Sequence, residues 1–228
     1  MSRGGQPTEL SPDLLLRAYA TGIFPMSEAR DDDKIFWVDP EVRGILPLDA
    51  YHIPRSLKKV VRRGKFEARF DTAFVEVLDL CADTAPDREN TWINGPIRNA
   101  VIRLHEMGFA HSVESWQDGE LVGGLYGIAL GSAFFGESMF SRRSDASKVA
   151  LVNLLALLHL GHYHLLDTQF VTDHLGTFGT IEIPADAYRT RLETALKYQS
   201  LFHSTVAEAQ LKQAVDRVLT ESSPRKQP

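Results

Sequence analysis

The stretch "LVGGLYGIALGSAFFGESMFS", residues 121–141, carries the clearest structural signal in this chain. Two apolar runs are separated by Gly131 and Ser132, a pattern that predicts two strands joined by a tight turn. The preceding "HSVESW" (111–116) and the turn "QDGE" (117–120) predict a third strand, so the region is expected to be an antiparallel meander. Glu137 lies inside the last apolar run, where burying a carboxylate is costly unless it is paired.

A long apolar helix is predicted after the meander. The segment "SDASKVALVNLLALLHLG" (144–161) offers Ser144 or Asp145 as a cap and Gly161 as a stop, and "YHLLDTQF" (163–170) follows as a buried strand. A meander, a central helix and a further strand are typical of the acetyltransferase (GNAT-like) fold. We therefore predict an α+β fold, with a GNAT-like acyltransferase domain and a small N-terminal α/β domain.

The flanking segments suggest a division into three parts. We assign 1–51 to a small N-terminal domain, 52–200 to the GNAT-like catalytic domain and 201–228 to a C-terminal helix and tail. Helix starts are predicted at Ser11, at Asp71 and at Thr205, where Glu208 would complete a capping box. Short strands broken by Asp39-Pro40 are predicted near the end of the first part.

Composition limits the cellular setting and the partners. The chain has 228 residues, a net charge of −5 and one cysteine, Cys81. One cysteine excludes an internal disulfide and fits a reducing compartment, and no apolar run has the length of a membrane span. We expect a cytoplasmic monomer without membrane contact.

The histidines of "HLGHYH" (159–164) match no helical metal-binding pair, so we predict no metal.

One local segment is strongly basic. "RSLKKVVRRGK" (55–65) holds six basic residues in eleven and no acid. Five of them recur at the spacing of one helix face, with Leu57, Val60 and Val61 opposite. A solvated charged face is one interpretation, and a track for nucleic-acid phosphates is the other. The residues of this basic face are Arg55, Lys58, Lys59, Arg62 and Arg63.

Several blocks of the sequence resemble the bacterial leucyl/phenylalanyl-tRNA–protein transferase family. They run in that family's order between residues 14 and 192. The blocks are "GIFPM", "HIPRSLKK", "TWI", "LHEMGFAHSVESW", "LVGGLYGIALG", "FFGESMFS", "ASKVAL", "LLDTQ" and "HLGTFG". The resemblance implies transfer of leucine or phenylalanine from aminoacyl-tRNA to proteins that begin with Arg or Lys, which marks them for degradation. An aminoacyl ester is already activated, so no ATP, metal or other cofactor is expected.

The resemblance also implies roles for individual residues. Asp167 and Gln169 would form the catalytic centre that orients and helps deprotonate the amine, supported by Glu137. Since residues two apart on a strand share a side, this pair could act together. It could equally just end the strand. The remaining implied contacts are an aminoacyl side-chain pocket of Leu125, Phe134, Leu151, Leu154 and Leu166, an adenosine site of Trp92 and Met26, and tRNA phosphates on the basic face.

Two other functions remain open from the sequence. A coenzyme-A-dependent N-acetyltransferase would use the same scaffold, but the loop "SRRSDAS" (141–147) lacks the glycines that would let a backbone wrap a pyrophosphate. A non-catalytic RNA-binding adaptor would use the basic face alone. In relatives that carry tryptophan at the position of Met26, stacking is aromatic, whereas here a softer thioether contact replaces it.

Overall fold

A seven-stranded mixed sheet forms the centre of the molecule. The computed structural model describes residues 10–83 and 90–222. In spatial order the strands are β4 (Glu67–Phe70), β5 (Ala110–Gln117), β6 (Glu120–Leu130), β7 (Ala133–Ser141), β8 (Leu165–Gln169), β3 (Val42–Ile45) and β9 (Ile181–Pro184). Strands β5, β6 and β7 pair antiparallel, which confirms the predicted meander, and β7 pairs parallel with β8.

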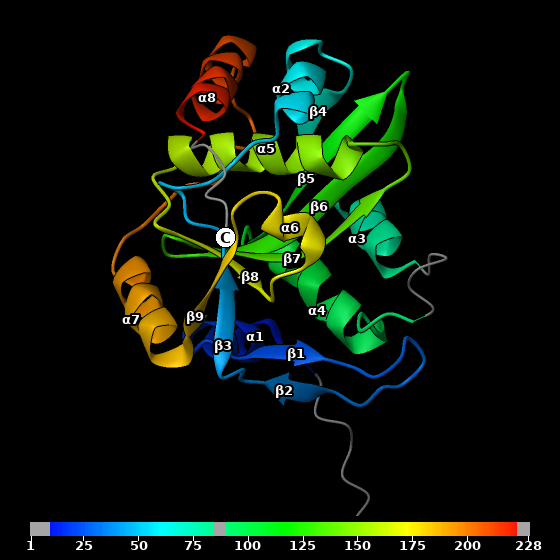
Figure 1. The fold of residues 1–228 in the computed structure, drawn as a ribbon. Helices are drawn as coiled ribbons and strands as arrows, with labels where there is room; N and C mark the ends of the chain where they lie inside the picture. Colours follow the sequence, from blue (N-terminus) through cyan, green and yellow to red (C-terminus); the bar gives the residue numbers. More distant parts are fainter. Residues whose placement is uncertain (1–9, 84–89, 223–228) are drawn as a thin grey trace, which may run out of the picture.

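Helices cover both faces of this sheet (Figure 1). On one face lie α2 (Arg55–Arg62), α5 (Ala146–Leu160) and α8 (Glu208–Glu221), which share one apolar cluster with the sheet. The other face is covered by α1 (Pro12–Ala20), α3 (Phe74–Ala82), α4 (Gly95–Glu106) and α7 (Ala185–Leu196). The fold is therefore mixed, as an α+β class requires, with the core split into two layers.

Along the strands, successive side chains point alternately into these two layers of the core. Phe134 packs into the α5 layer and Phe135 into the α1 layer, and Leu166 and Leu165 divide in the same way. Where β7 and β8 begin to pair they are covered on both faces, so "AFF" (133–135) and "LL" (165–166) are apolar throughout rather than alternating. This arrangement explains why "SAFFG" and "YHLLD" were recognisable as buried strands.

Beside the sheet, the N-terminal segment forms a small hairpin. Strands β1 (Phe24–Met26) and β2 (Phe36–Val38) make a separate two-stranded sheet. Strand β3, placed in the small N-terminal domain by the sequence, instead lies inside the large sheet between β8 and β9. The division at residue 51 stays a prediction, and residues 223–228 of the third part lie outside the described residues.

Of the helix caps predicted at Ser11, Asp71 and Thr205, the last two are wrong. Ser11 caps α1 as predicted, because its hydroxyl accepts from the Leu14 amide. Asp71 does not cap α3; its backbone is left-handed and its carboxylate accepts from the Ser112 amide at 2.8 Å instead. Thr205 does not cap α8 either, since that helix begins at Glu208 without a side-chain cap.

The start of α5 also differs from its predicted cap. Asp145 occupies the N-cap position but adopts a left-handed backbone, and its side chain makes no capping hydrogen bond. Its carboxylate instead pairs with Lys148 at 3.1 Å.

No helix in the described part of the chain is long and apolar enough to cross a membrane.

The meander tolerates no side chain at Gly127. A Cβ atom added there would overlap the ring of Phe134 and the backbone oxygen of Phe135. We expect Gly127→Ala to lower the free energy of unfolding by about 2 kcal/mol or more, because backbone cannot yield as a flexible side chain can. Chemical denaturation measures this. Gly95→Ala is the control, with nothing within 4 Å of the added atom, and equal effects of the two changes would contradict the expectation.

Candidate active site

A cavity of about 470 Å³ opens where β7 and β8 part. The parallel ladder between these strands ends at the pair Phe135–Asp167, and beyond it the strands no longer pair. The wall is contributed by β6, β7, β8, α5, the short helix α6 (Asp173–Gly176), β1 and the loop before α4. Separation of adjacent strands in an otherwise paired sheet thus creates the space.

Two bulges shape the polar end of this cavity. On β7 the register shifts so that Glu137 is an extra residue between Gly136 and Ser138. On β8 a second shift leaves Thr168 as an extra residue opposite β3. Bulges re-aim side chains, and both of these residues line the cavity.

The apolar wall contains four of the five residues predicted for the aminoacyl side chain. Phe134 is the exception, because its ring packs against Tyr163 and Phe202 at centroid distances of 6.3 and 5.7 Å, away from the cavity. Met139 lines the wall as well and was not predicted. The four predicted residues on the wall are Leu125, Leu151, Leu154 and Leu166.

Glu137 presents its carboxyl group to the cavity. The residue is partly exposed there, and the Tyr19 hydroxyl hydrogen-bonds to it from behind. Burial raises the pKa of Glu137 to about 8; Tyr19 and Arg43 oppose the shift, and the charge of Asp167 adds to it. At neutral pH this carboxyl group is therefore mostly protonated, and it can gain or lose a proton in the working range of an enzyme.

Asp167 is not exposed at all and does not line the cavity. Its carboxylate is held by Arg43, with Nε to Oδ1 at 2.9 Å and Nη2 to Oδ2 at 2.6 Å, and the Tyr188 hydroxyl donates to Oδ2 at 2.6 Å. Burial disfavours the charge of Arg43, but its hydrogen bonds and attraction to Asp167 raise its pKa above the ordinary value. The predicted catalytic pair is therefore not brought to the same surface.

Gln169 connects the buried carboxylate with the cavity. Its backbone is left-handed, with φ of 55°, and its N–H donates to Asp167 Oδ1 at 2.8 Å. The left-handed turn ends the strand alternation, so Gln169 does not share a side with Asp167. Its side-chain amide lines the cavity and donates to Glu137 Oε1 at 3.2 Å. Gln169 and Glu137 therefore meet at the cavity, whereas Asp167 is buried and does not line it.

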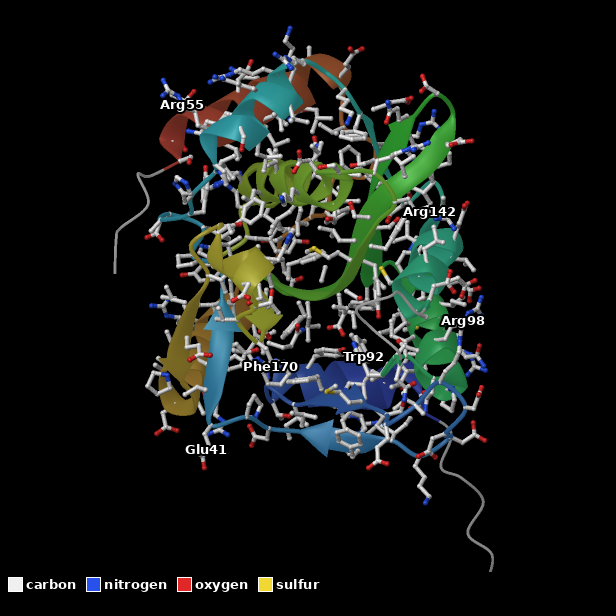
Figure 2. The ribbon with its side chains drawn as sticks, turned by 45° about the vertical axis from the view of Figure 1, so that its right-hand side comes forward. Glu41, Arg55, Trp92, Arg98, Arg142 and Phe170 are labelled. Atoms are coloured by element: carbon white, nitrogen blue, oxygen red, sulfur yellow. The ribbon has the colours of Figure 1, made fainter. Side chains whose placement is uncertain are left out.

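Four apolar residues, Phe24, Met26, Trp92 and Phe170, line the cavity on the side of the β1–β2 hairpin. Trp92 and Met26, both predicted for adenosine, line it together with Phe170, which the sequence analysis missed. Trp92 and Phe170 lie on the same face of the molecule, between α6 and the hairpin (Figure 2). Phe170 is 47% exposed and packs edge-on against Phe24 at 5.8 Å. The exposed position of Phe170 depends on the turn at Gln169, which no sequence pattern indicated.

The basic face is formed as predicted. Leu57 is buried against the α5 layer, while Arg55, Lys59 and Arg62 are exposed on α2. Lys58 is partly buried, and burial together with the nearby Arg62 lowers its pKa. A second hollow lies along this face, lined by the basic side chains with His52 and Ser222. Arg55 lies far from Trp92, at the other end of the molecule (Figure 2).

The histidines near the end of α5 serve local contacts. His164 Nδ1 lies 2.8 Å from the Ser132 hydroxyl, and the His159 ring packs 5.7 Å from Tyr51. Within residues 10–83 and 90–222, no group of at least three potential metal ligands comes together. In the cavity Gln169 can offer hydrogen bonds, and Glu137 can offer hydrogen bonds and proton transfer.

The pKa of Glu137 has a consequence for stability. An unfolded glutamate ionises near pH 4.3, whereas folded Glu137 keeps its proton up to about pH 8. The contribution of this group is complete below pH 4 and is lost as the pH rises toward 8. We expect the free energy of unfolding of the wild type to fall by roughly 4 kcal/mol relative to Glu137→Gln between pH 4 and 8. Denaturation of both proteins across this range measures the difference; parallel curves would contradict it.

Comparison with known proteins confirms the resemblance stated from the sequence. Residues 45–193 match the family model described as leucyl/phenylalanyl-tRNA protein transferase, and residues 8–41 match the model of its N-terminal domain. A leucyl/phenylalanyl-tRNA–protein transferase of Paramagnetospirillum magneticum is 58% identical over 200 residues, covering 87% of this chain and 96% of the relative. A protein of the same name from Nitrobacter winogradskyi is 56% identical over 202 residues, covering 89% and 90%. The chain therefore belongs to the leucyl/phenylalanyl-tRNA–protein transferase family and is an aminoacyltransferase.

Proposed function

We propose that this chain transfers leucine or phenylalanine from aminoacyl-tRNA to the N-terminal amine of proteins that begin with Arg or Lys, and so marks them for degradation in an N-degron pathway. The observation that carries the proposal is the cavity itself. It combines an apolar wall with polar residues, among them Glu137 and Gln169, whose side chains hydrogen-bond to each other. The GNAT-like character of the scaffold belongs to the same proposal, supported by the parting of β7 and β8 beside α5.

The apolar wall would receive the aminoacyl side chain. Leu125, Met139 and Leu154 offer only hydrocarbon and thioether surface, which suits leucine and phenylalanine and leaves a polar side chain without partners. Such a wall separates apolar side chains weakly from one another, because one methylene is worth about 1–3 kcal/mol. Acceptance of two different apolar amino acids is thus the natural behaviour of this cavity.

The reaction requires an amine and an ester to meet. The amine nitrogen attacks the ester carbonyl carbon, the bond from that carbon to the ribose oxygen breaks, and a proton passes from nitrogen to the leaving oxygen. An α-amine has an ordinary pKa of about 8, so a useful fraction is neutral near pH 7. Holding the two groups in contact can supply roughly 7–11 kcal/mol of the barrier.

Glu137 and Gln169 would perform this positioning. The Gln169 amide can accept a hydrogen bond from the amine through its oxygen while its N–H₂ group holds Glu137. Glu137 in its ionised form can take the proton of the amine, since burial raises its pKa to about 8, close to that of the amine. A direct contact of Asp167 with the amine stays a prediction; its carboxylate is occupied by Arg43, Tyr188 and the Gln169 amide.

The terminal adenosine would lie against Trp92, with Met26 and Phe170 beside it. Stacking of a base on an aromatic ring is worth about 1–3 kcal/mol. Here Phe170 supplies an aromatic ring on the same face as Trp92, where Met26 supplies only a thioether. The phosphates of the acceptor stem would meet the basic face of α2. The cytoplasmic location and the monomeric state stay predictions.

The proposed function is tested by mixing the protein with radiolabelled leucyl-tRNA and a peptide that begins with arginine, without ATP. We expect label in the peptide, and none when the peptide begins with alanine, because only a cationic first residue should be accepted. Peptide chromatography with scintillation counting measures the transfer. Binding of the tRNA without any transfer would instead favour a non-catalytic RNA-binding adaptor, and saturable coenzyme A binding would favour an acetyltransferase.

The assignment of the basic face is tested by reversing its charge. We expect the double change Lys58→Glu, Lys59→Glu to raise the KM for leucyl-tRNA at least about tenfold and to flatten its dependence on salt, because phosphate contacts release counterions. The matched control is Arg191→Glu, Lys197→Glu, which makes the same charge change at exposed positions on and beside α7. Equal KM values for the two double variants would refute the assignment.

A further inference from the structure

The buried pair Arg43–Asp167 joins four segments that are distant in sequence. Arg43 comes from β3 and Asp167 from β8, and Arg43 Nη1 donates to the Gly22 carbonyl oxygen at 2.9 Å, just before β1. Tyr188 of α7 completes the group through its hydroxyl. The exposed fractions of Arg43 and Asp167 are 1% and 0%. Little room is left for this guanidinium to adopt a second geometry.

Two aromatic rings also pack against the guanidinium. Its central carbon lies 4.5 Å from the ring centroid of Phe24 and 4.6 Å from that of Tyr188. A buried ion pair of this kind adds little net stability, since desolvation offsets most of the attraction. Its best-supported use is to impose one geometry on the groups around it. The question is which geometry this pair imposes.

The answer lies in the backbone of Gln169. A non-glycine residue with φ of 55° is strained by about 1 kcal/mol or more. The hydrogen bond from the Gln169 N–H to Asp167 Oδ1, at 2.8 Å, stabilises that turn. The same turn sends the Gln169 amide to the cavity, where it donates to Glu137. These contacts therefore form one series from Arg43 through Asp167 and Gln169 to Glu137.

We propose that Arg43 is a positioning residue for aminoacyl transfer: by clamping Asp167 it holds the left-handed turn at Gln169 and aims the Gln169 amide into the cavity. On this account Asp167 acts on the reaction through Gln169, and Tyr188 assists by occupying the second oxygen of the carboxylate. The inference rests on the proposed function, and it adds Arg43 and Tyr188 to the residues that control the rate.

The test is a kinetic cycle with the full-length chain. Arg43→Lys keeps the positive charge but loses the two-pronged contact with Asp167 and cannot also reach Gly22. Gln169→Asn shortens the side chain that reaches Glu137 and suits a left-handed backbone. We expect Arg43→Lys to lower kcat by about 10- to 100-fold with less than about a twofold change in the KM for leucyl-tRNA. In the Gln169→Asn background the same change should lower kcat by less than about twofold, because residues that act in series are not additive.

A matched control separates positioning from general destabilisation. Arg98 makes a similar forked contact with Asp79, at 2.5 and 2.8 Å, but on the partly exposed surface between α4 and α3. We expect Arg98→Lys to keep kcat within about twofold of the wild type. Each protein is assayed well below its measured Tm. If Arg43→Lys does not fold, Tyr188→Phe takes its place in the cycle, since it removes only the hydroxyl that donates to Asp167.

Each outcome decides between the alternatives. A kcat loss for Arg43→Lys that disappears in the Gln169→Asn background supports the inference. Wild-type kcat in Arg43→Lys, or equal losses in both backgrounds, overturns the inference and leaves the proposed function intact. A wild-type chain that transfers no leucine overturns the proposed function, and the inference with it.

Discussion

The parting of β7 from β8 is the constraint on which the functional end of this molecule depends. Two buried neighbouring strands that stop pairing leave backbone groups that must find other partners. Here the loss is confined to a short length, because the ladder runs up to Phe135 and Asp167 and each strand then bulges. The side chain of Asp167 takes over one of the freed amides, that of Gln169. At this opening in the sheet, the carboxylate of Asp167 thus accepts the backbone hydrogen bond that a neighbouring strand would otherwise accept.

Two acids close to this opening behave differently because their partners differ. Asp167 faces a guanidinium and a hydroxyl and is fully enclosed, so its charge is matched where it lies. Glu137 is held by a hydroxyl and an amide and has no cation in direct contact, so burial raises its pKa to about 8. The direct contact with Arg43 distinguishes Asp167 from Glu137, whose raised pKa lets it exchange a proton near neutral pH. Residue type alone does not distinguish the two roles.

Much of the architecture could be predicted from the sequence because it rests on local patterns. Apolar runs bounded by glycine gave the meander and α5, and the basic stripe with Leu57 opposite gave the face of α2. The features that could not be predicted depend on contacts between distant segments. Strand β3 lies in the large sheet, Asp71 accepts a hydrogen bond from Ser112 instead of capping α3, and Arg43 encloses Asp167. In each case the partner lies far away in the chain. Phe134 could not be separated from the wall residues because core and cavity use the same side chains.

The hydrocarbon wall of the cavity has a consequence for the fate of an activated ester. Water competes with any amine for such a carbonyl, and a water molecule can attack only where polar atoms hold it in place. Along Leu125, Leu151 and Leu154 the wall offers no side-chain polar atom to do so. On the proposed function, the leucine surface would therefore favour transfer over hydrolysis, and a donor side chain that fills this surface would keep water away from its ester.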